Sequence, residues 1–159
     1  MGKTENRLEA LGIVLPEKVG PSPLADHVMT RQAGGFLFVA GACPLAGGKP
    51  WITGKLVKDM KHEAGYEAAR IAAFHVLAAA GEALGTLDRI ASVVKVTGYV
   101  ACEDDFYDQY MIINGASHLF NEVLEDRGSH VSTAVGVNTL PFNVPVMLDA
   151  VFCLTPEAE

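Results

Sequence analysis

Two strongly apolar segments of this chain each carry one charged residue near the middle. They are Ile90–Val100, which contains Lys95, and Pro145–Leu154, which contains Asp149. Their β-branched and aromatic content predicts strands, and apolar residues fall on both alternating faces. Such strands need cover on both faces, and an ionised carboxylate there must be paired, hydrogen-bonded or beside a water-filled cleft. Asp149 is therefore either a buried structural partner or the acid of a site.

Composition favours one ordinary domain spanning residues 1–159. Half of the residues are apolar, and 12 basic against 19 acidic residues give a formal charge of −7. This charge and the lack of a basic run disfavour a nucleic-acid partner. We expect no membrane partner, because no apolar run is long enough to span a bilayer and no signal peptide is evident. Three cysteines without a Cys-x-x-Cys spacing predict reduced thiols and a cytoplasmic location.

The predicted element order is β-β-α-β-α-β-β, after an N-terminal lead-in over residues 1–24. The lead-in is expected to contain a short helix, Thr4–Leu11, and an extended stretch with prolines. The core covers about residues 26–154. Its expected elements are strands at about 27–32 and 36–41, a loop at 43–51, a helix from His62 to Leu84 capped by Asp59, a strand at 90–101, a helix from Phe106 to Arg127 capped by Asp104 or Asp105 and closed by Gly128, and strands at 133–137 and 144–154.

Two helices can cover only one face of such a sheet. The second face, which carries Met147, Val151 and Cys153, is also apolar. Self-association is the simplest source of its cover. The predicted fold class is therefore α+β, a mixed sheet with two helices on one face, in a chain that associates with copies of itself.

The histidines and cysteines show no metal-binding pattern. His62-Glu63 lacks the second histidine of a zinc motif, so neither a metal nor a cofactor is predicted. His75 and His118 on helices are expected to be structural. His130, at a strand entrance, is a better candidate for a site.

Three further residues have two interpretations each. Lys95 either pairs with Asp149 across the sheet or serves a site. Ser132 and Thr133 begin a strand and could supply hydroxyls to a cleft, although such residues are common there. The residues alone do not decide between these interpretations.

Several segments, taken in order, resemble the Rid family, also known as YjgF or endoribonuclease L-PSP. They are Val39-Ala-Gly-Ala-Cys-Pro44, Lys95-Val-Thr-Gly-Tyr-Val100 running into Asp104-Asp-Phe106, Ser132-Thr-Ala-Val-Gly-Val-Asn-Thr-Leu-Pro141 and Val146-Met-Leu-Asp-Ala-Val151. The resemblance covers about residues 36–152 and is nearest to a divergent branch. It implies a chorismate-mutase-like fold of Rid type and a homotrimer whose sheets pack into a central barrel, with three clefts between subunits.

The resemblance also implies a chemistry. Well-studied members hydrolyse imines and enamines to keto acids and ammonia without metal or cofactor; an arginine binds the substrate carboxylate, and a glutamate positions water. Counted from Leu140-Pro141, the arginine position falls on Ser132 and the acidic position on Asp149. A serine hydroxyl does not replace a guanidinium fork. Little hydrolysis of 2-iminobutanoate or 2-iminopropanoate is therefore expected, unless Arg31, Lys95 or His130 supplies the cation.

Three functions remain open at this point. The favoured one is hydrolysis, such as deamination, of a small imine, enamine or related metabolite. Its expected site residues are Asp149 to orient water, and Ser132, Thr133, Val135, Gly41, His130 and His27 to bind substrate. The second function is a non-enzymatic metabolite-binding or regulatory trimer. The third, an endoribonuclease, is disfavoured by the acidic charge.

Overall fold

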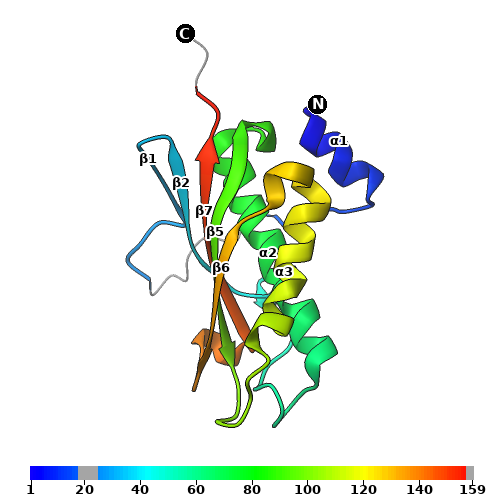
Figure 1. Ribbon diagram of the computed structural model, residues 1–159, viewed down its shortest axis with the longest axis vertical. Helices are drawn as coiled ribbons and strands as arrows, with labels where there is room; N and C mark the ends of the chain where they lie inside the picture. Colours follow the sequence, from blue (N-terminus) through cyan, green and yellow to red (C-terminus); the bar gives the residue numbers. More distant parts are fainter. Residues whose placement is uncertain (18–24, 157–159) are drawn as a thin grey trace.

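In the computed structural model, which describes residues 1–17 and 25–156, a five-stranded sheet lies beside two long helices (Figure 1). Its strands are β1 (Thr30–Ala33), β2 (Phe36–Ala42), β5 (Ile90–Ala101), β6 (Val131–Val137) and β7 (Val146–Leu154). Their order across the sheet is β1-β2-β7-β5-β6. β5 and β6 run parallel, and the other neighbouring pairs run antiparallel. The predicted α+β class with a mixed sheet is confirmed.

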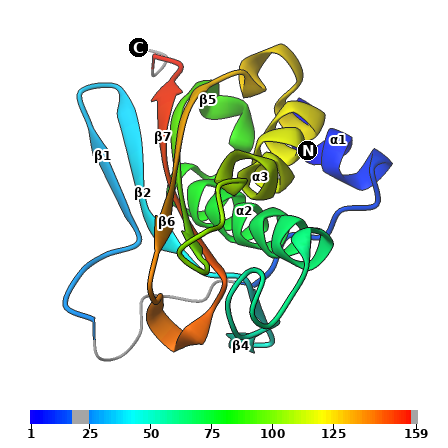
Figure 2. The same cartoon turned by 60° about the horizontal axis from the view of Figure 1, so that its bottom comes forward.

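The two long helices cover one face of the sheet, as predicted (Figure 2). They are α2 (His62–Leu84) and α3 (Gln109–Leu124). A shorter helix, α1 (Lys3–Ala10), packs against α3 and against the 3-10 turn η1 (Leu87–Arg89). No helix within the described residues has the length and apolar character needed to cross a membrane.

Small residues let α2 and α3 pack closely. Five alanines of α2 are fully buried, namely Ala68, Ala69, Ala72, Ala73 and Ala80. On α3, a Cβ atom added to Gly115 would lie 2.0 Å from the backbone oxygen of Tyr66 on α2. The helix runs unbroken through Gly115. This glycine therefore permits a close contact between the helices, although it costs some intrinsic helix stability.

The caps of both long helices differ from the prediction, although α2 begins at His62 as expected. Lys61 precedes α2 without a side-chain cap, because the Asp59 carboxylate accepts a hydrogen bond from the backbone N–H of Lys55 at 2.8 Å instead. α3 begins after Asp108, which also makes no side-chain cap, so neither Asp104 nor Asp105 caps it. The acidic residues that suggested caps are thus either used in a local turn or lie too early in the chain.

The end of α3 also differs from the prediction. The α-helix stops at Leu124, and a 3-10 turn, η2 (Glu125–Gly128), follows. The residue with a left-handed backbone is Glu125, with φ of 54°, and not Gly128. Gly128 is instead buried, and an added Cβ would lie 2.4 Å from the Phe120 carbonyl oxygen. The backbone at Gly128 therefore packs so closely against the end of α3 that only glycine fits there.

Smaller differences concern the connections. β1 begins at Thr30, three residues after the predicted strand start. The predicted loop at 43–51 contains a short hairpin of β3 (Leu45–Ala46) and β4 (Lys49–Pro50). A 3-10 turn, η3 (Pro141–Asn143), lies between β6 and β7. The predicted extended stretch up to residue 24 lies partly outside the described residues.

The other face of the sheet lies away from α2 and α3, and we call it the open face. Strand register assigns to it Arg31, Phe36, Phe38, Lys95, Thr97, Tyr99, Val131, Thr133, Val135, Met147, Asp149, Val151 and Cys153. Several of its apolar side chains are exposed in the single chain, with fractions of 47% for Phe38, 66% for Val131 and 39% for Val135. The predicted apolar second face is therefore present.

Candidate functional site

A row of three polar residues crosses three adjacent strands on the open face. Asp149 of β7 lies opposite Thr97 of β5, and Thr97 lies beside Thr133 of β6. Opposite residues in a sheet point to the same side, and across an antiparallel pair such as β5 and β7 their Cβ atoms lie about 4.5–5.5 Å apart. The carboxylate and the two threonine hydroxyls therefore form one polar strip, and we call it the polar row.

A tyrosine holds the acid of this row. The Tyr99 hydroxyl donates a hydrogen bond to Oδ2 of Asp149 at 2.8 Å. This bond, followed by burial and the carboxylate charge, raises the pKa of Tyr99 above its usual range. Tyr99 is thus a neutral donor at physiological pH. Oδ1 of Asp149 accepts no hydrogen bond from the described residues, so it can receive one from water or a ligand.

Lys95 lies one step from the polar row but does not pair with its acid. It stands opposite Val151, and is therefore a diagonal neighbour of Asp149. Its side chain is exposed and makes no ion pair within residues 1–17 and 25–156. The alternative in which Lys95 and Asp149 form a structural ion pair is not realised.

Gly41 and Val135 lie near the Tyr99 end of the site. A Cβ atom added to Gly41 would lie 2.7 Å from Sδ of Met147. The glycine therefore lets the Met147 side chain rest against the β2 backbone. Val135 stands beside Tyr99, and Tyr99 stands opposite Met147. These residues form an apolar border along one side of the polar row.

Ser132 lies on the opposite side of the sheet from Asp149. It is paired with Val96, which is fully buried beneath the helices. The Ser132 hydroxyl oxygen is buried and has no hydrogen-bond partner. The structure therefore places Ser132 on the other side of the sheet from Asp149, whereas Thr133 shares the open face with Asp149, one strand beyond Thr97.

His130 makes structural contacts on the helical side. Its Nδ1 lies 2.7 Å from the Gly128 carbonyl oxygen, which can only accept, so Nδ1 carries the hydrogen. Its Nε2 then accepts from the Ser117 hydroxyl at 2.9 Å. The ring also meets Phe120 edge-on. Both nitrogens are engaged, so His130 is not available to the polar row.

The remaining histidines add nothing to the polar row. The predicted site residue His27 is exposed and lies just before β1, the strand at the far edge of the sheet from β5 and β6. His75 donates through Nε2 to the Leu45 carbonyl oxygen at 2.9 Å. His118 shares a hydrogen bond of 2.8 Å with the Tyr66 hydroxyl. These last two contacts agree with the structural roles expected for helix histidines.

Metal ligands do not cluster in the part of the chain that the structure describes, where no group of three His, Cys, Asp or Glu side chains could hold an ion. Cys43, Cys102 and Cys153 are free thiols. Burial raises the pKa of Cys43 to about 11, so this thiol stays protonated at physiological pH. A protonated thiol is a poor nucleophile.

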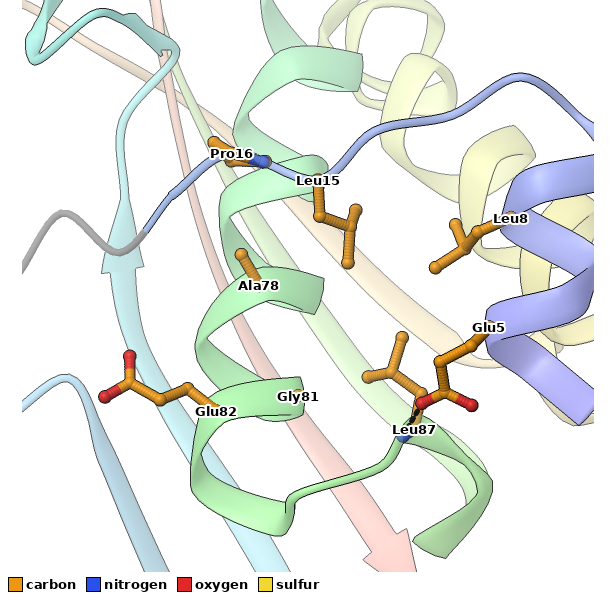
Figure 3. A pocket seen from close by; sticks show the side chains of 8 residues that line it. All are labelled: Glu5, Leu8, Leu15, Pro16, Ala78, Gly81, Glu82 and Leu87. Carbon is orange, nitrogen blue, oxygen red and sulfur yellow. Dashed lines mark hydrogen bonds between the residues drawn. The ribbon is translucent and has the colours of Figure 1, made fainter. Parts of the chain in front are cut away.

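A pocket of about 420 Å³ lies in another part of the molecule, between α1, α2 and the chain after α1 (Figure 3). Its walls are mainly apolar and include Leu8, Leu15 and Leu87. Glu5 at its edge already accepts through Oε1 from the Leu87 N–H at 2.8 Å. Its other oxygen, Oε2, is buried without a hydrogen-bond partner. The polar row combines its acid with three hydroxyl groups on one open surface, and it is therefore the candidate site.

Sequence reasoning missed two members of the site. Thr97 and Tyr99 follow Lys95 at alternate positions, so the period of a strand places all three on one face. That signal was present in the sequence. The pairing of Tyr99 with Asp149 was not, because it depends on the register between β5 and β7.

Comparisons with known proteins give one consistent result. Residues 5–154 match the model of a family described as "YjgF/chorismate_mutase-like, putative endoribonuclease". Protein TCP17 of Trypanosoma cruzi is 36% identical over 150 residues, which cover 94% of this chain and 92% of that protein.

Two solved structures are similar over nearly their whole length. Atu1372 of Agrobacterium tumefaciens, of unknown function, has 37% identity and a TM-score of 0.87, with 96% of this chain and 93% of that chain covered. A "putative endoribonuclease" of Shewanella oneidensis MR-1 has 26% identity and a TM-score of 0.90, with coverage of 96% and 100%.

Proposed function

Because the chain belongs to the YjgF/chorismate mutase-like family, as its ordered motifs predicted, we propose that the polar row is the site of a small-molecule hydrolase. Its substrate would be a small imine, enamine or related metabolite, and the reaction would be a deamination. The observation that carries this proposal is Asp149: it is a carboxylate on an otherwise apolar strand, fixed at one oxygen by Tyr99 and open at the other.

The proposed chemistry uses Asp149 to position water. Oδ1 of Asp149 accepts a proton from the water while the water oxygen bonds to the imine carbon. Asp149 returns that proton to the nitrogen, which gives an amino alcohol. The hydroxyl proton of this intermediate then passes to the nitrogen as the carbon–nitrogen bond breaks, so that ammonia leaves and the carbonyl forms. The Tyr99 bond keeps the carboxylate oriented. The hydroxyls of Thr97 and Thr133 lie beside it in the row and would bind the substrate.

Self-association belongs to this proposal. The exposed apolar side chains of the open face, such as Phe38 and Val131, would be costly to leave in water. We propose a homotrimer that covers this face and forms clefts between subunits, to which Gly41, Val135 and His27 would contribute. Light scattering coupled to gel filtration tests this assembly, and a stable folded monomer would contradict it. The free thiols support the proposed cytoplasmic location.

A binding or regulatory trimer is the alternative function. It is favoured by the burial of Ser132, where the family's carboxylate-binding arginine was expected. The overall charge of −7 remains an argument against RNA as substrate. Substitution of one residue, Asp149, distinguishes the hydrolase hypothesis from the binding-protein hypothesis.

Asp149→Asn keeps the shape of the side chain but removes the proton acceptor. Imines would be generated in place by an amino-acid oxidase from a panel of amino acids, and their loss followed against spontaneous hydrolysis. We expect the variant to lose about 10²–10⁴-fold in rate, while Asp105→Asn, an exposed acid in the loop before α3, keeps full activity. Equal rates for Asp149→Asn and the parent chain would remove Asp149 from catalysis. Metabolite binding without turnover would establish the alternative.

A further inference from the structure

The pocket between α1, α2 and the chain after α1 has no part in the reaction proposed for the polar row (Figure 3). It lies on the helical side of the sheet, whereas the polar row lies on the open face. We infer that this pocket is a second binding site, and that its ligand is a small organic amine, with an ammonium group on an apolar body. This inference does not depend on the function of the polar row.

The size and the walls of the pocket fit a small ligand. Its volume of about 420 Å³ falls within the range of about 300–1,000 Å³ that is typical of ligand pockets. The side chains of Leu8, Leu15 and Leu87 turn toward one another around it (Figure 3). On α2 the lining residues Ala78 and Gly81 are small and leave the space open. An apolar group that fills this space gains free energy by leaving water.

Glu5 supplies an unsatisfied acceptor at the edge of the pocket. Its Oε1 accepts from the Thr86 hydroxyl at 3.0 Å and from the Leu87 N–H at 2.8 Å, and these two bonds fix the orientation of the carboxylate. Its Oε2 is buried and accepts no hydrogen bond from the described residues. Burial of a carboxylate oxygen without a donor is costly, and buried polar atoms in folded proteins nearly always have a partner. Oε2 is therefore an acceptor left for a ligand.

The charges at the pocket favour a cation over an anion. Its described lining residues include two acids, Glu5 and Glu82, and no basic residue. A further carboxylate lies close to Glu5, because a Cβ atom added to Gly2 would overlap both Oε2 of Glu5 and Oδ2 of Asp88. Neighbouring carboxylates repel each other, and a cation bound beside them reduces that repulsion.

The basic side chains of this region have partners of their own. Lys3 pairs with Glu125 at 3.3 Å. Arg7 donates to a backbone carbonyl oxygen of α3, and Arg127 donates to a backbone carbonyl oxygen and a threonine hydroxyl. Within residues 1–17 and 25–156, none of them contacts the second oxygen of Glu5. An external cation is thus the group that can satisfy it.

These features define the ligand class. A primary ammonium would donate to Oε2 of Glu5, while an aliphatic or aromatic body would lie against the three leucines. A hydrogen bond between two charged groups is stronger than one in which the donor is neutral. An alcohol of the same shape would keep the apolar contacts and lose the ion pair.

The experiment compares two probes, phenethylamine and phenethyl alcohol, whose binding is measured by NMR titration of the backbone amides. The proteins are the parent chain and three variants. Glu5→Gln keeps an acceptor for the Leu87 N–H but removes the charge. Glu9→Gln is the matched control, at an exposed acid of the same helix. Ala78→Phe fills the pocket with a ring and leaves Glu5 unchanged.

We expect Glu5→Gln to weaken binding of the amine by about ten- to a hundredfold, the range of a charge-assisted hydrogen bond, and to change binding of the alcohol much less. The parent chain should prefer the amine to the alcohol by a similar factor. Glu9→Gln should change neither affinity. Ala78→Phe should weaken both probes, because the space for their rings is then occupied.

A parent chain that does not bind the amine, or that binds the alcohol equally well, would overturn the inference. Amine affinity unchanged in Glu5→Gln or in Ala78→Phe would also overturn it, because the ligand would then lie elsewhere. An equal loss for both probes in Glu5→Gln would do the same, since it would reflect altered packing of α1. Should Glu5→Gln fail to fold, the parent chain's preference and Ala78→Phe still decide the outcome. The imine assay of Asp149→Asn is independent of all these results.

Discussion

The two faces of the sheet are built from the same strands but carry different kinds of residue. On the helical side, Leu37, Val93 and Phe152 stand in register and are buried beneath α2 and α3. On the open face, the same three strands present Phe38, Lys95 and Val151, of which Phe38 is 47% exposed. The helical face therefore stabilises the chain by itself, whereas the open face keeps apolar surface and polar groups available for a partner or ligand.

The polar groups follow the same division. The acid, the two threonines of the polar row and Lys95 are on the open face, whereas the helical face has the buried Ser132 hydroxyl. A close-packed core tolerates few polar groups because each needs a partner. The comparison suggests that the helical face determines the fold and the open face determines the function.

The largest expected effect comes from replacing one phenylalanine on each face of the sheet by alanine. Phe152→Ala removes a fully buried ring that meets Phe120 edge-on at 6.1 Å, and we expect a loss of about 3–5 kcal/mol in unfolding free energy. Phe38→Ala should cost a dilute monomer much less, because its ring is half exposed. Denaturant unfolding at two protein concentrations measures both. Equal losses in a dilute, monomeric sample would break the comparison.

A second test uses adjacent residues of β6. Ser132→Arg puts a large charged side chain beneath α3, and we expect overpacking to cost about 1–3 kcal/mol. Thr133→Arg places the same side chain on the open face and should change the melting temperature of a monomer little. Calorimetry of both variants gives the difference. If Thr133→Arg were the more destabilising, the assigned direction of the β6 side chains would be wrong.

A third, smaller effect concerns α1, which lies on the helical side. The Asp88 carboxylate accepts from the N–H groups of Lys3 at 2.6 Å and Thr4 at 2.8 Å, and from the Thr4 hydroxyl. The Thr4 side-chain bond is the main cause of a lowered pKa at Asp88, although burial opposes it. We expect Asp88→Asn to cost about 0.5–1 kcal/mol at pH 7, since the group is partly exposed.

The sign of the pH dependence follows from that lowered pKa. The Asp88 contribution is complete above the unfolded pKa of about 4 and disappears as pH falls through the lower folded value. Thermal melts at pH 7 and at decreasing pH should therefore show the parent chain and Asp88→Asn converging in acid. A constant difference down to the acid limit would show that the charge of Asp88 does not matter.

The smallest effect is a titration on the open face. Because the hydrogen bond to Asp149 raises the pKa of Tyr99, phenolate formation should begin above the usual pH of about 10. The contribution of this bond to stability is present below that pH and is lost as pH rises through the folded pKa. Ultraviolet titration of Asp149→Asn should show one tyrosine moved to lower pH. An unchanged curve would mean that the two groups do not interact in solution.

Much of the fold could be predicted from local patterns. The strands at 90–101 and near 146–154 matched because their β-branched residues leave few alternatives, and α2 matched because alanine, a strong helix former, recurs along its whole length. The helix caps and the ends of α3 could not be predicted this way. Asp59 turned back to Lys55, and α1 is capped by Asp88, which lies far along the chain. Such contacts depend on how the chain folds and cannot be predicted from the residues next to each helix.

The candidate site was predictable only in part. A single acid on an apolar strand pointed to Asp149, but its partner Tyr99 required the register of two strands. The sequence did not reveal which side chains of β6 face the helices, and there is a physical reason for this. α3 lies so close to β6 that small residues such as Ser132, Ala134 and Gly136 fit beneath it, while the larger Val131 and Val135 point away. The usual rule that larger apolar residues point inward therefore gave no guidance.

The position of β7 has a consequence for how the protein is made. β7 lies at the centre of the sheet between β2 and β5, yet the ribosome synthesises it after every other strand of that sheet. Until β7 is made, one edge of β2 has no strand to pair with, because residues such as Leu37 pair with residues of β7 such as Phe152. Pairing between such distant segments is slow to form. In the nascent chain, β2 and β5 thus each keep one edge without its partner until the last strand is made and joins the two halves of the sheet.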